Sequence, residues 1–194
     1  MAAQTSKKLL RRRLKDVLNA MSQETRDQQS SLITEKILAN PIYNKSRRVG
    51  IYLNMPEEVN TDALVRDVLT SGKECFIPRC TKLVMTMEKL HSIEDYENLA
   101  PNSWGIKEPL QEELRESSAL NGGLDLVIVP GLGFTNTGQR IGRGKGYYDK
   151  FLSEMKLLRE GSCFTTIGVA FKEQIVDEIP TSEHDFRLDF VISS

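Results

Sequence analysis

Residues 124–129 constrain the fold most, because they read LDLVIV, an almost continuous run of branched apolar residues. A run this short, ended by Pro130-Gly131, is typical of a strand that is buried on both faces of a parallel sheet. Further strands are predicted at residues 49–53, 75–77, 165–171 and 189–192, with an edge strand at residues 84–90. We therefore expect a parallel sheet that helices cover on both sides.

A helix is predicted over residues 6–20. Its apolar positions recur at spacings of three and four and form one broad face, made of Leu9, Leu10, Leu14, Val17, Leu18 and Met21. Lys7 and Arg11 fall just beyond the edge of that face. From there they can pack their stems inward and present charge at the rim of a cleft.

The other helices are predicted from caps and breakers. Ser22 is expected to cap a helix that ends near residue 38, and further helices are predicted over residues 62–69 and from about residue 148 to residue 159. Residues 92–118 are polar and contain two prolines, which favours irregular chain with short helical turns. Strand, helix and strand thus alternate along the chain, as in α/β proteins.

The length and charge of the chain limit the classes of protein to which it can belong. The chain has 194 residues, of which 39% are hydrophobic and 27% charged, and this fits a single globular domain over residues 1–194. A formal net charge of -1 gives no overall field that would draw the protein to nucleic acid or to an anionic membrane. No apolar run approaches the roughly 20 residues of a membrane span. Anion binding would therefore be local.

Cysteine and histidine usage indicates a cytoplasmic protein without a zinc site. Cys75, Cys80 and Cys163 lack CxxC spacing, which is typical of free thiols in a reducing compartment. Neither histidine has a metal-ligand neighbour at helical or turn spacing. The basic residues that precede Asp16 resemble a transit peptide. The helical pattern continues past Asp16 without a break, however, which favours a helix of the folded body.

A glycine-rich basic segment, PGLGFTNTGQRIGRGKGYYDKFL, directly follows the strand at residues 124–129. It contains Gly131, Gly133, Gly138, Gly142, Gly144 and Gly146, with Arg140, Arg143 and Lys145 among them. Alternating glycines let backbone N–H groups turn toward one point as an anion nest, and the next helix adds the positive end of its dipole. No Walker A or Rossmann glycine motif fits the segment. We predict that it binds a nucleotide phosphate; a glycine-rich turn with solvated charges is the alternative.

Polar and aromatic residues elsewhere add candidates for the site. Asp149 ends the glycine-rich segment, where a carboxylate suits Mg²⁺ or simply caps a helix, and Asp185 is a candidate second ligand. Glu58 follows the first strand, where it would accept hydrogen bonds from an amino-bearing heterocycle or remain solvated. Trp104 offers a stacking face, although a lone Trp is more often a core residue. Cys163 begins an apolar strand and is interpreted as a core residue.

The same residues resemble the 5-formyltetrahydrofolate cyclo-ligase family, also called 5,10-methenyltetrahydrofolate synthetases. The resemblance rests on the basic first helix and on LDLVIVPGLGF, GQRIGRGKGYYDKFL, YLNMPEEVNT, SWGIKEP and AFKEQIVDEIP, which together span essentially the whole chain. It implies a three-layer α/β/α sandwich with a mostly parallel, Rossmann-like sheet. It also implies that ATP, with Mg²⁺, phosphorylates the formyl oxygen of 5-formyltetrahydrofolate. The folate's nitrogen at position ten then attacks the activated carbon, and loss of phosphate yields 5,10-methenyltetrahydrofolate.

The resemblance also implies roles for single residues. ATP would be contacted by Lys7, Lys8, Leu9, Leu10, Arg11, Arg140, Ile141, Gly142, Arg143, Gly144, Lys145, Gly146, Tyr147 and Tyr148. The folate would be contacted by Arg11, Leu53, Glu58, Arg143, Gly144, Lys145, Gly146 and Tyr147. Arg143, Lys145 and Tyr147 would act on the reacting groups, and Asp149 and Asp185 would hold Mg²⁺. The protein would be a monomer whose substrate carries one glutamate or a polyglutamate tail.

Two other functions fit parts of the sequence. An RNA-binding module would use the basic first helix and the glycine-arginine loop, and its affinity would fall steeply with salt. The near-neutral net charge and the lack of interleaved aromatic residues disfavour it. A sugar-phosphate isomerase or acyl-CoA transferase on a similar fold would keep the phosphate loop but would not require ATP.

Overall fold

The computed structural model describes residues 2–81, 84–102, 105–110, 112–120, 122–158 and 164–194. Its centre is a six-stranded sheet with the order β10-β9-β6-β1-β2-β3. The strands are β1 (Arg48–Ile51), β2 (Glu74–Cys80), β3 (Met85–Leu90), β6 (Leu126–Val129), β9 (Thr165–Ala170) and β10 (Phe190–Ser193). All neighbours in this sheet are parallel except β2 and β3, which are antiparallel. The predicted edge strand is therefore confirmed as β3.

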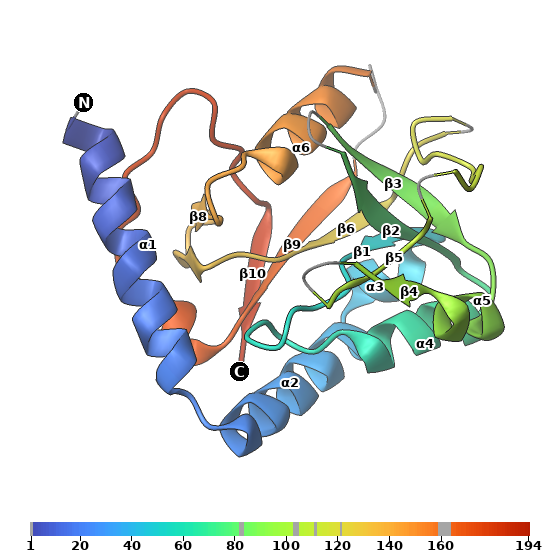
Figure 1. The fold of residues 1–194 in the computed structure, drawn as a ribbon, viewed down its shortest axis with the longest axis horizontal. Coiled ribbons are helices and arrows are strands. Elements are labelled where there is room, and N and C mark those ends of the chain that lie inside the picture. Colours follow the sequence, from blue (N-terminus) through green and yellow to red (C-terminus); the bar gives the residue numbers. More distant parts are fainter. Residues whose placement is uncertain (1, 82–83, 103–104, 111, 121, 159–163) are drawn as a thin grey trace.

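Helices cover both faces of the sheet (Figure 1). The longer ones are α1 (Ala2–Ala20), α2 (Gln23–Leu38), α4 (Asp62–Thr70) and α6 (Tyr147–Leu158), and the short ones are α3 (Pro41–Lys45), α5 (Ile93–Asn98) and the 3-10 helix η1 (Lys172–Gln174). Figure 1 shows α6 on the face opposite to α2 and α4. This arrangement confirms the predicted α/β/α sandwich with a mostly parallel sheet.

The two core layers follow from strand periodicity. Leu126 and Ile128 of β6 belong to the hydrophobic cluster that contains the buried residues of α1, α2 and α4. Val127 and Val129 belong to the second cluster, together with Phe151 and the other buried residues of α6. All four β6 side chains are fully buried, because successive residues of a strand point to opposite faces. The prediction that this strand is buried on both sides is confirmed.

The predicted end of the strand at residue 77 is wrong, because β2 continues through Pro78 to Cys80. The parallel neighbour β1 pairs with β2 only as far as Phe76. Beyond that point only the antiparallel neighbour β3 remains, and Pro78 is opposite Met87 of that strand. Proline is tolerated where one side of a strand has no partner, since the missing N–H is not required there.

Helix α1 has a narrower apolar face than predicted. Leu14 and Leu18 are buried, but Leu9 is 64% exposed, so its assignment to the apolar face is wrong. Lys7 and Arg11 are half-buried, in agreement with their predicted position at the edge of the face. In the next helix, the Ser22 hydroxyl accepts a hydrogen bond from the Thr25 N–H at 3.1 Å, which confirms the predicted cap of α2.

The polar stretch of residues 92–118 contains α5 and a two-stranded ribbon of β4 (Ala100–Pro101) and β5 (Lys107–Glu108). Trp104 and Cys163, for which a stacking role and a core role were considered, lie outside the described residues. Among the described residues, no helix is both long enough and apolar enough to span a bilayer.

Candidate active site

A cleft of about 1680 Å³ lies at the carboxyl ends of the central strands. Tyr52 and Leu53 follow β1, Cys80 ends β2, and Pro130-Gly131 follow β6, and all of them line the cleft. β1 has β2 on one side and β6 on the other, so the chain reverses its direction of winding at this strand. Open α/β sheets bind ligands at such a switch point, where adjacent connections diverge.

The glycine-rich segment forms one wall of this cleft. A hairpin of β7 (Gly133–Phe134) and β8 (Arg140–Ile141) leads into residues 142–146, which run directly into the N-terminus of α6. Gly144 and Gly146 have φ angles of 106° and 71°, a backbone region that favours glycine. Within the described chain, the backbone N–H groups of residues 142–146 donate no hydrogen bond. Unbonded N–H groups just before a helix N-terminus are the donors that an anion nest requires.

Arg140 is held inside the wall by Asp149. Its guanidinium donates to Asp149 Oδ1 at 2.9 Å and to the Pro130 carbonyl oxygen at 3.2 Å. The Arg140 side chain is only 4% exposed, whereas that of Asp149 is 21% exposed. Asp149 Oδ1 also accepts from the Phe186 N–H at 3.2 Å. Asp149 is thus neither a simple cap nor a solvated acid; it neutralises a buried cation in the first turn of α6.

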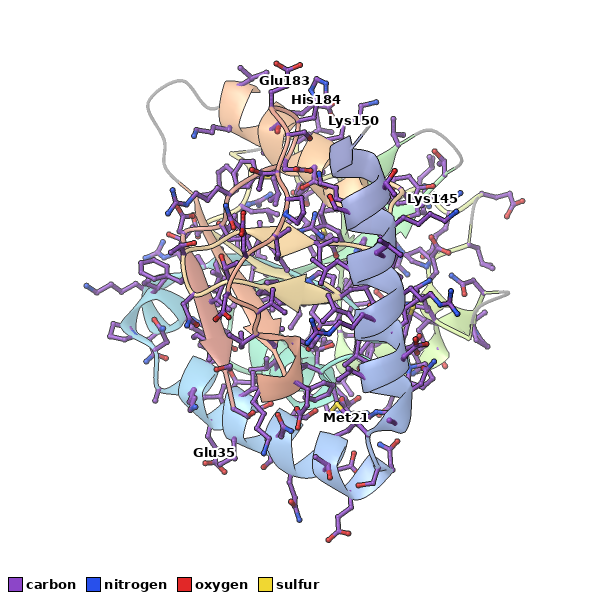
Figure 2. All side chains as sticks on the ribbon, turned by 90° about the vertical axis from the view of Figure 1, so that its left-hand side faces the viewer. Met21, Glu35, Lys145, Lys150, Glu183 and His184 are labelled. Atoms are coloured by element: carbon purple, nitrogen blue, oxygen red, sulfur yellow. The ribbon has the colours of Figure 1, made fainter. Side chains whose placement is uncertain are left out.

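Lys7 and Asp185 join α1 to the loop before β10. The Lys7 ammonium lies 2.5 Å from Asp185 Oδ2, which also accepts from the Ser182 N–H at 2.6 Å. Partial burial disfavours the charged carboxylate, but Lys7 and Ser182 outweigh it and lower the pKa of Asp185. Figure 2 shows the neighbouring Glu183 and His184 near the N-terminal end of α1.

Arg143 pairs with two glutamates of the loop after β1. Its guanidinium donates to Glu57 Oε1 at 2.9 Å, and its Nε lies 3.5 Å from Glu58 Oε1. The Glu58 side chain is only 11% exposed, and its Oε2 accepts from the Met55 N–H at 3.1 Å. Burial raises the pKa of Glu58 despite these bonds. For Glu57, burial acts in the same direction, but hydrogen bonds from its own N–H and from Arg143 lower the pKa.

Three further predicted residues border the glycine-rich segment. Arg11 Nε donates to the Gly142 carbonyl oxygen at 2.9 Å, which fixes α1 against the segment. Lys145 is exposed, and Figure 2 shows it beside the N-terminal half of α1. The Tyr147 hydroxyl donates to the Thr81 carbonyl oxygen at 2.9 Å. Residues from three separate regions of the sequence therefore meet along one wall.

The structure brings most of the predicted site residues into this one cleft. Its lining contains Lys7, Arg11, Leu53, Glu58, Arg140, Ile141, Gly142, Arg143, Gly144, Lys145, Gly146, Tyr147, Tyr148, Asp149 and Asp185. Lys8, Leu9 and Leu10 are not part of the lining; Lys8 and Leu9 are exposed, and Leu10 packs against the core. The cleft is also lined by Asn102, Lys107 and Glu108, which were not predicted as site residues. The SWGIKEP segment, already part of the resemblance, was the available signal for the last two.

The two predicted metal ligands are each bonded through one oxygen. Asp149 accepts through Oδ1 and Asp185 through Oδ2, and within the described residues their other oxygens accept no hydrogen bond. The described residues contain no cluster of three or more Asp, Glu, His or Cys side chains that would enclose an ion. Mg²⁺ commonly takes only one or two protein carboxylates together with water and phosphate oxygens. The donor set fits that kind of site.

Comparison with known proteins decides the family. The sequence profile described as the 5-formyltetrahydrofolate cyclo-ligase family matches residues 3–194. The chain belongs to this family. It is 43% identical over 190 residues to the 5-formyltetrahydrofolate cyclo-ligase of Mus musculus, covering 97% of this chain and 93% of the mouse protein. The Saccharomyces cerevisiae protein of the same name is 31% identical and matches 96% of this chain and 94% of its own length.

Solved structures agree with the cyclo-ligase assignment. The Aquifex aeolicus 5,10-methenyltetrahydrofolate synthetase superposes with a TM-score of 0.76 at 29% identity, over 95% of this chain and 88% of that one. A Mycoplasma pneumoniae 5,10-methenyltetrahydrofolate synthetase, 19% identical, has the same fold with a TM-score of 0.70. The resemblance noted in the sequence is confirmed, and the chain is an enzyme of the cyclo-ligase family.

Proposed function

We propose that the protein uses ATP to convert 5-formyltetrahydrofolate to 5,10-methenyltetrahydrofolate, with release of ADP and phosphate. One observation carries the proposal for a member of this family. A single cleft joins an open nest of backbone N–H groups, flanked by Arg143 and Lys145, to a covered carboxyl group, Glu58. The nest suits a phosphate, and the covered carboxyl suits the amino-bearing edge of a heterocycle.

The phosphate side of the cleft would act by position and charge. Phosphoryl transfer needs little covalent participation from the protein, so donors aimed at the developing charge account for most of the catalysis. The N–H groups of residues 142–146, the N-terminus of α6 and the exposed Lys145 are the donors available there. Asp149 and Asp185 would hold Mg²⁺, which supplies neutralisation of phosphate oxygens.

The folate side would orient the group that is phosphorylated. Leu53 and Glu58 would contact the pterin, and Arg143 lies between Glu58 and the nest, where it can face the formyl oxygen. In the reaction that we propose, ATP transfers its terminal phosphoryl group to that oxygen, and ADP leaves. The substrate's own nitrogen at position ten then forms the new bond to carbon as phosphate departs. No Ser, Cys or His nucleophile of the protein is required.

A direct assay tests the proposal. Purified protein is mixed with Mg-ATP and 5-formyltetrahydrofolate, and methenyl-folate absorbance is followed with and without ATP. We expect an increase only with ATP. No increase with folded protein would refute the function, and an equal increase without ATP would refute the proposed dependence on ATP. Binding of RNA that weakens steeply with salt would support the RNA-binding alternative.

We further propose that the enzyme acts as a cytoplasmic monomer on folates with one or more glutamates. Gel filtration and cell fractionation test the first two statements. Comparison of monoglutamyl and pentaglutamyl 5-formyltetrahydrofolate in the same assay tests the third.

A further inference from the structure

Unpaired buried polar atoms concentrate in the segment 140–148. Within the described chain, seven buried side-chain nitrogen or oxygen atoms lack a hydrogen-bond partner, and three of them belong to Arg140, Arg143 and Tyr148. Buried polar groups are nearly always paired, and an unpaired one lowers stability, so each requires an explanation. The two arginines bond through their other nitrogens, to Asp149 and Glu57. Tyr148 has no polar side-chain atom other than its unpaired hydroxyl.

The position of the Tyr148 ring is fixed by packing. The ring contacts both hydrophobic core clusters, and the Arg140 guanidinium lies over it, 5.6 Å from the ring centroid. Arg140 is itself held by Asp149 and the Pro130 carbonyl oxygen. The ring therefore cannot swing into solvent without loss of core packing, and the hydroxyl remains beside the cleft that Tyr148 lines.

The surroundings of the hydroxyl do not suit a phosphate. The hydroxyl is buried, and Cys80 and Glu58 are close enough to act on it electrostatically. A phenol is neutral at pH 7 and can donate one hydrogen bond. A phosphate placed here would meet the Glu58 carboxyl, which is itself only 11% exposed. A flat heterocycle is a better match, because Glu58 accepts from N–H groups while the phenol donates to a carbonyl oxygen or ring nitrogen.

We propose that Tyr148 determines specificity for the folate, and that its hydroxyl donates a hydrogen bond to the polar edge of the pterin beside Glu58. The inference rests on the proposed function. It reassigns Tyr148 from the nucleotide contacts that the family resemblance implies to the substrate. The ligand-free enzyme keeps the donor unpaired and fixed in place, so the bond forms on binding without reorganisation of the ring. A pterin whose edge lacks the acceptor would leave the donor unpaired and bind more weakly.

The variant Tyr148→Phe tests the inference, since it removes one oxygen and preserves the packing. We expect the Kd for 5-formyltetrahydrofolate, measured by calorimetry, to rise about tenfold, the loss typical of one hydrogen bond. The Kd for a non-hydrolysable ATP analogue should change by less than about twofold. The ligand-free melting temperature should stay the same or rise, because the hydroxyl that is removed has no partner.

Tyr96→Phe is the matched control. Its hydroxyl donates to Asp62 Oδ1 at 2.9 Å, and Tyr96 does not line the cleft. This variant should lower the melting temperature and leave both dissociation constants unchanged. Suppose that wild-type protein binds and converts 5-formyltetrahydrofolate, but Tyr148→Phe binds it equally well or loses affinity only for the ATP analogue. The inference about Tyr148 is then overturned, while the proposed function stands. If wild-type protein does not bind the folate, the proposed function and the inference both fall.

Discussion

Two groups of side chains in the cleft differ in how their polar atoms are satisfied. The ion-paired group consists of Lys7 with Asp185 and Arg140 with Asp149, in which each cation already has a carboxylate at 2.9 Å or less. The covered group consists of Leu53, Glu58 and Tyr148, where a carboxyl group is desolvated and a phenol has no hydrogen-bond partner among the described residues. Both groups line the same cleft, so the difference lies in their chemistry and not in access.

Ligand binding has a different energetic consequence in each group. In the ion-paired group a ligand has to exchange one partner for another, and the net gain is the difference between two similar interactions. In the covered group the Tyr148 hydroxyl has no partner among the described residues, so a ligand adds a hydrogen bond there without displacing one. Lys145, exposed and without an ion pair in the described chain, stands apart from both because it can meet a phosphate without an exchange.

Lys145 is expected to show the largest effect. Lys145→Ala should lower kcat at least about a hundredfold, the loss seen when one donor to a transition-state charge is removed. The fold should not change, since the side chain is exposed. Absorbance kinetics and a melting curve measure both quantities, and Lys45→Ala, an exposed lysine on α3, is the control. A rate close to that of the control would remove Lys145 from the phosphate site.

Asp149 is expected to affect stability as well as turnover. Asp149→Ala leaves the Arg140 guanidinium, 4% exposed, without its carboxylate. Breaking a buried pair costs about 3–5 kcal/mol. Since Asp149 is partly exposed, we expect the free energy of unfolding, measured in urea, to fall by about 2 kcal/mol. Arg140→Met in the same background should restore part of the loss. A loss below about 0.5 kcal/mol would mean that the Arg140–Asp149 pair is solvated, so that a ligand need not displace one ionic partner to bind there.

The Lys7–Asp185 pair makes opposite predictions for metal and nucleotide. Lys7→Met removes the ammonium that occupies Asp185 Oδ2, so Mn²⁺ alone should bind about fivefold more tightly. The same change should weaken an ATP analogue by a similar factor, because Lys7 is then unavailable to the phosphates. Calorimetry with each ligand separately measures both. Weaker binding of Mn²⁺ in the variant would contradict the idea that a ligand must displace Lys7 from Asp185. It would also remove the contrast drawn between the two groups.

The sequence was sufficient for the parts of this site that depend on local pattern. The buried strand at residues 126–129, the helix after Tyr147 and the glycine turns between them follow from periodicity and from the φ angles that glycine permits. The family resemblance then assigned Lys7, Glu58 and Asp185 to the site, and all of them line the cleft.

Pairwise contacts between distant segments could not be predicted in this way. Nothing in the spacing shows that Asp149 bonds Arg140 or that Lys7 bonds Asp185, which is 178 residues away. These pairs depend on where α1 and the loop before β10 pack. The exposure of Leu9 has the same origin, because the width of an apolar face depends on what the fold places against it. The unpaired Tyr148 hydroxyl is likewise a property of the packed structure.

The smallest predicted effect concerns the pH dependence of stability at Glu57 and Glu58. Burial raises the pKa of Glu58, so the folded state holds its proton more tightly than the unfolded state. Its ionisation therefore lowers stability as pH rises from about 4.5, the usual value, through the folded-state pKa. Glu58→Gln should therefore become more stable than wild type as pH rises through that window, and it should remain more stable at pH 7.

Glu57 provides the matched control, because its carboxyl has the opposite shift. Burial opposes its ionisation, but its backbone N–H and Arg143 lower the pKa, so its contribution is present above pH 4.5 and is lost as pH falls through the folded-state value. Glu57→Gln should therefore lose stability relative to wild type at pH 7 and recover the difference in acid. Urea unfolding of both variants between pH 4 and pH 7 measures the two slopes. If the stability difference from wild type changed with pH in the same direction for both variants, the two carboxyl groups would not have opposite pKa shifts.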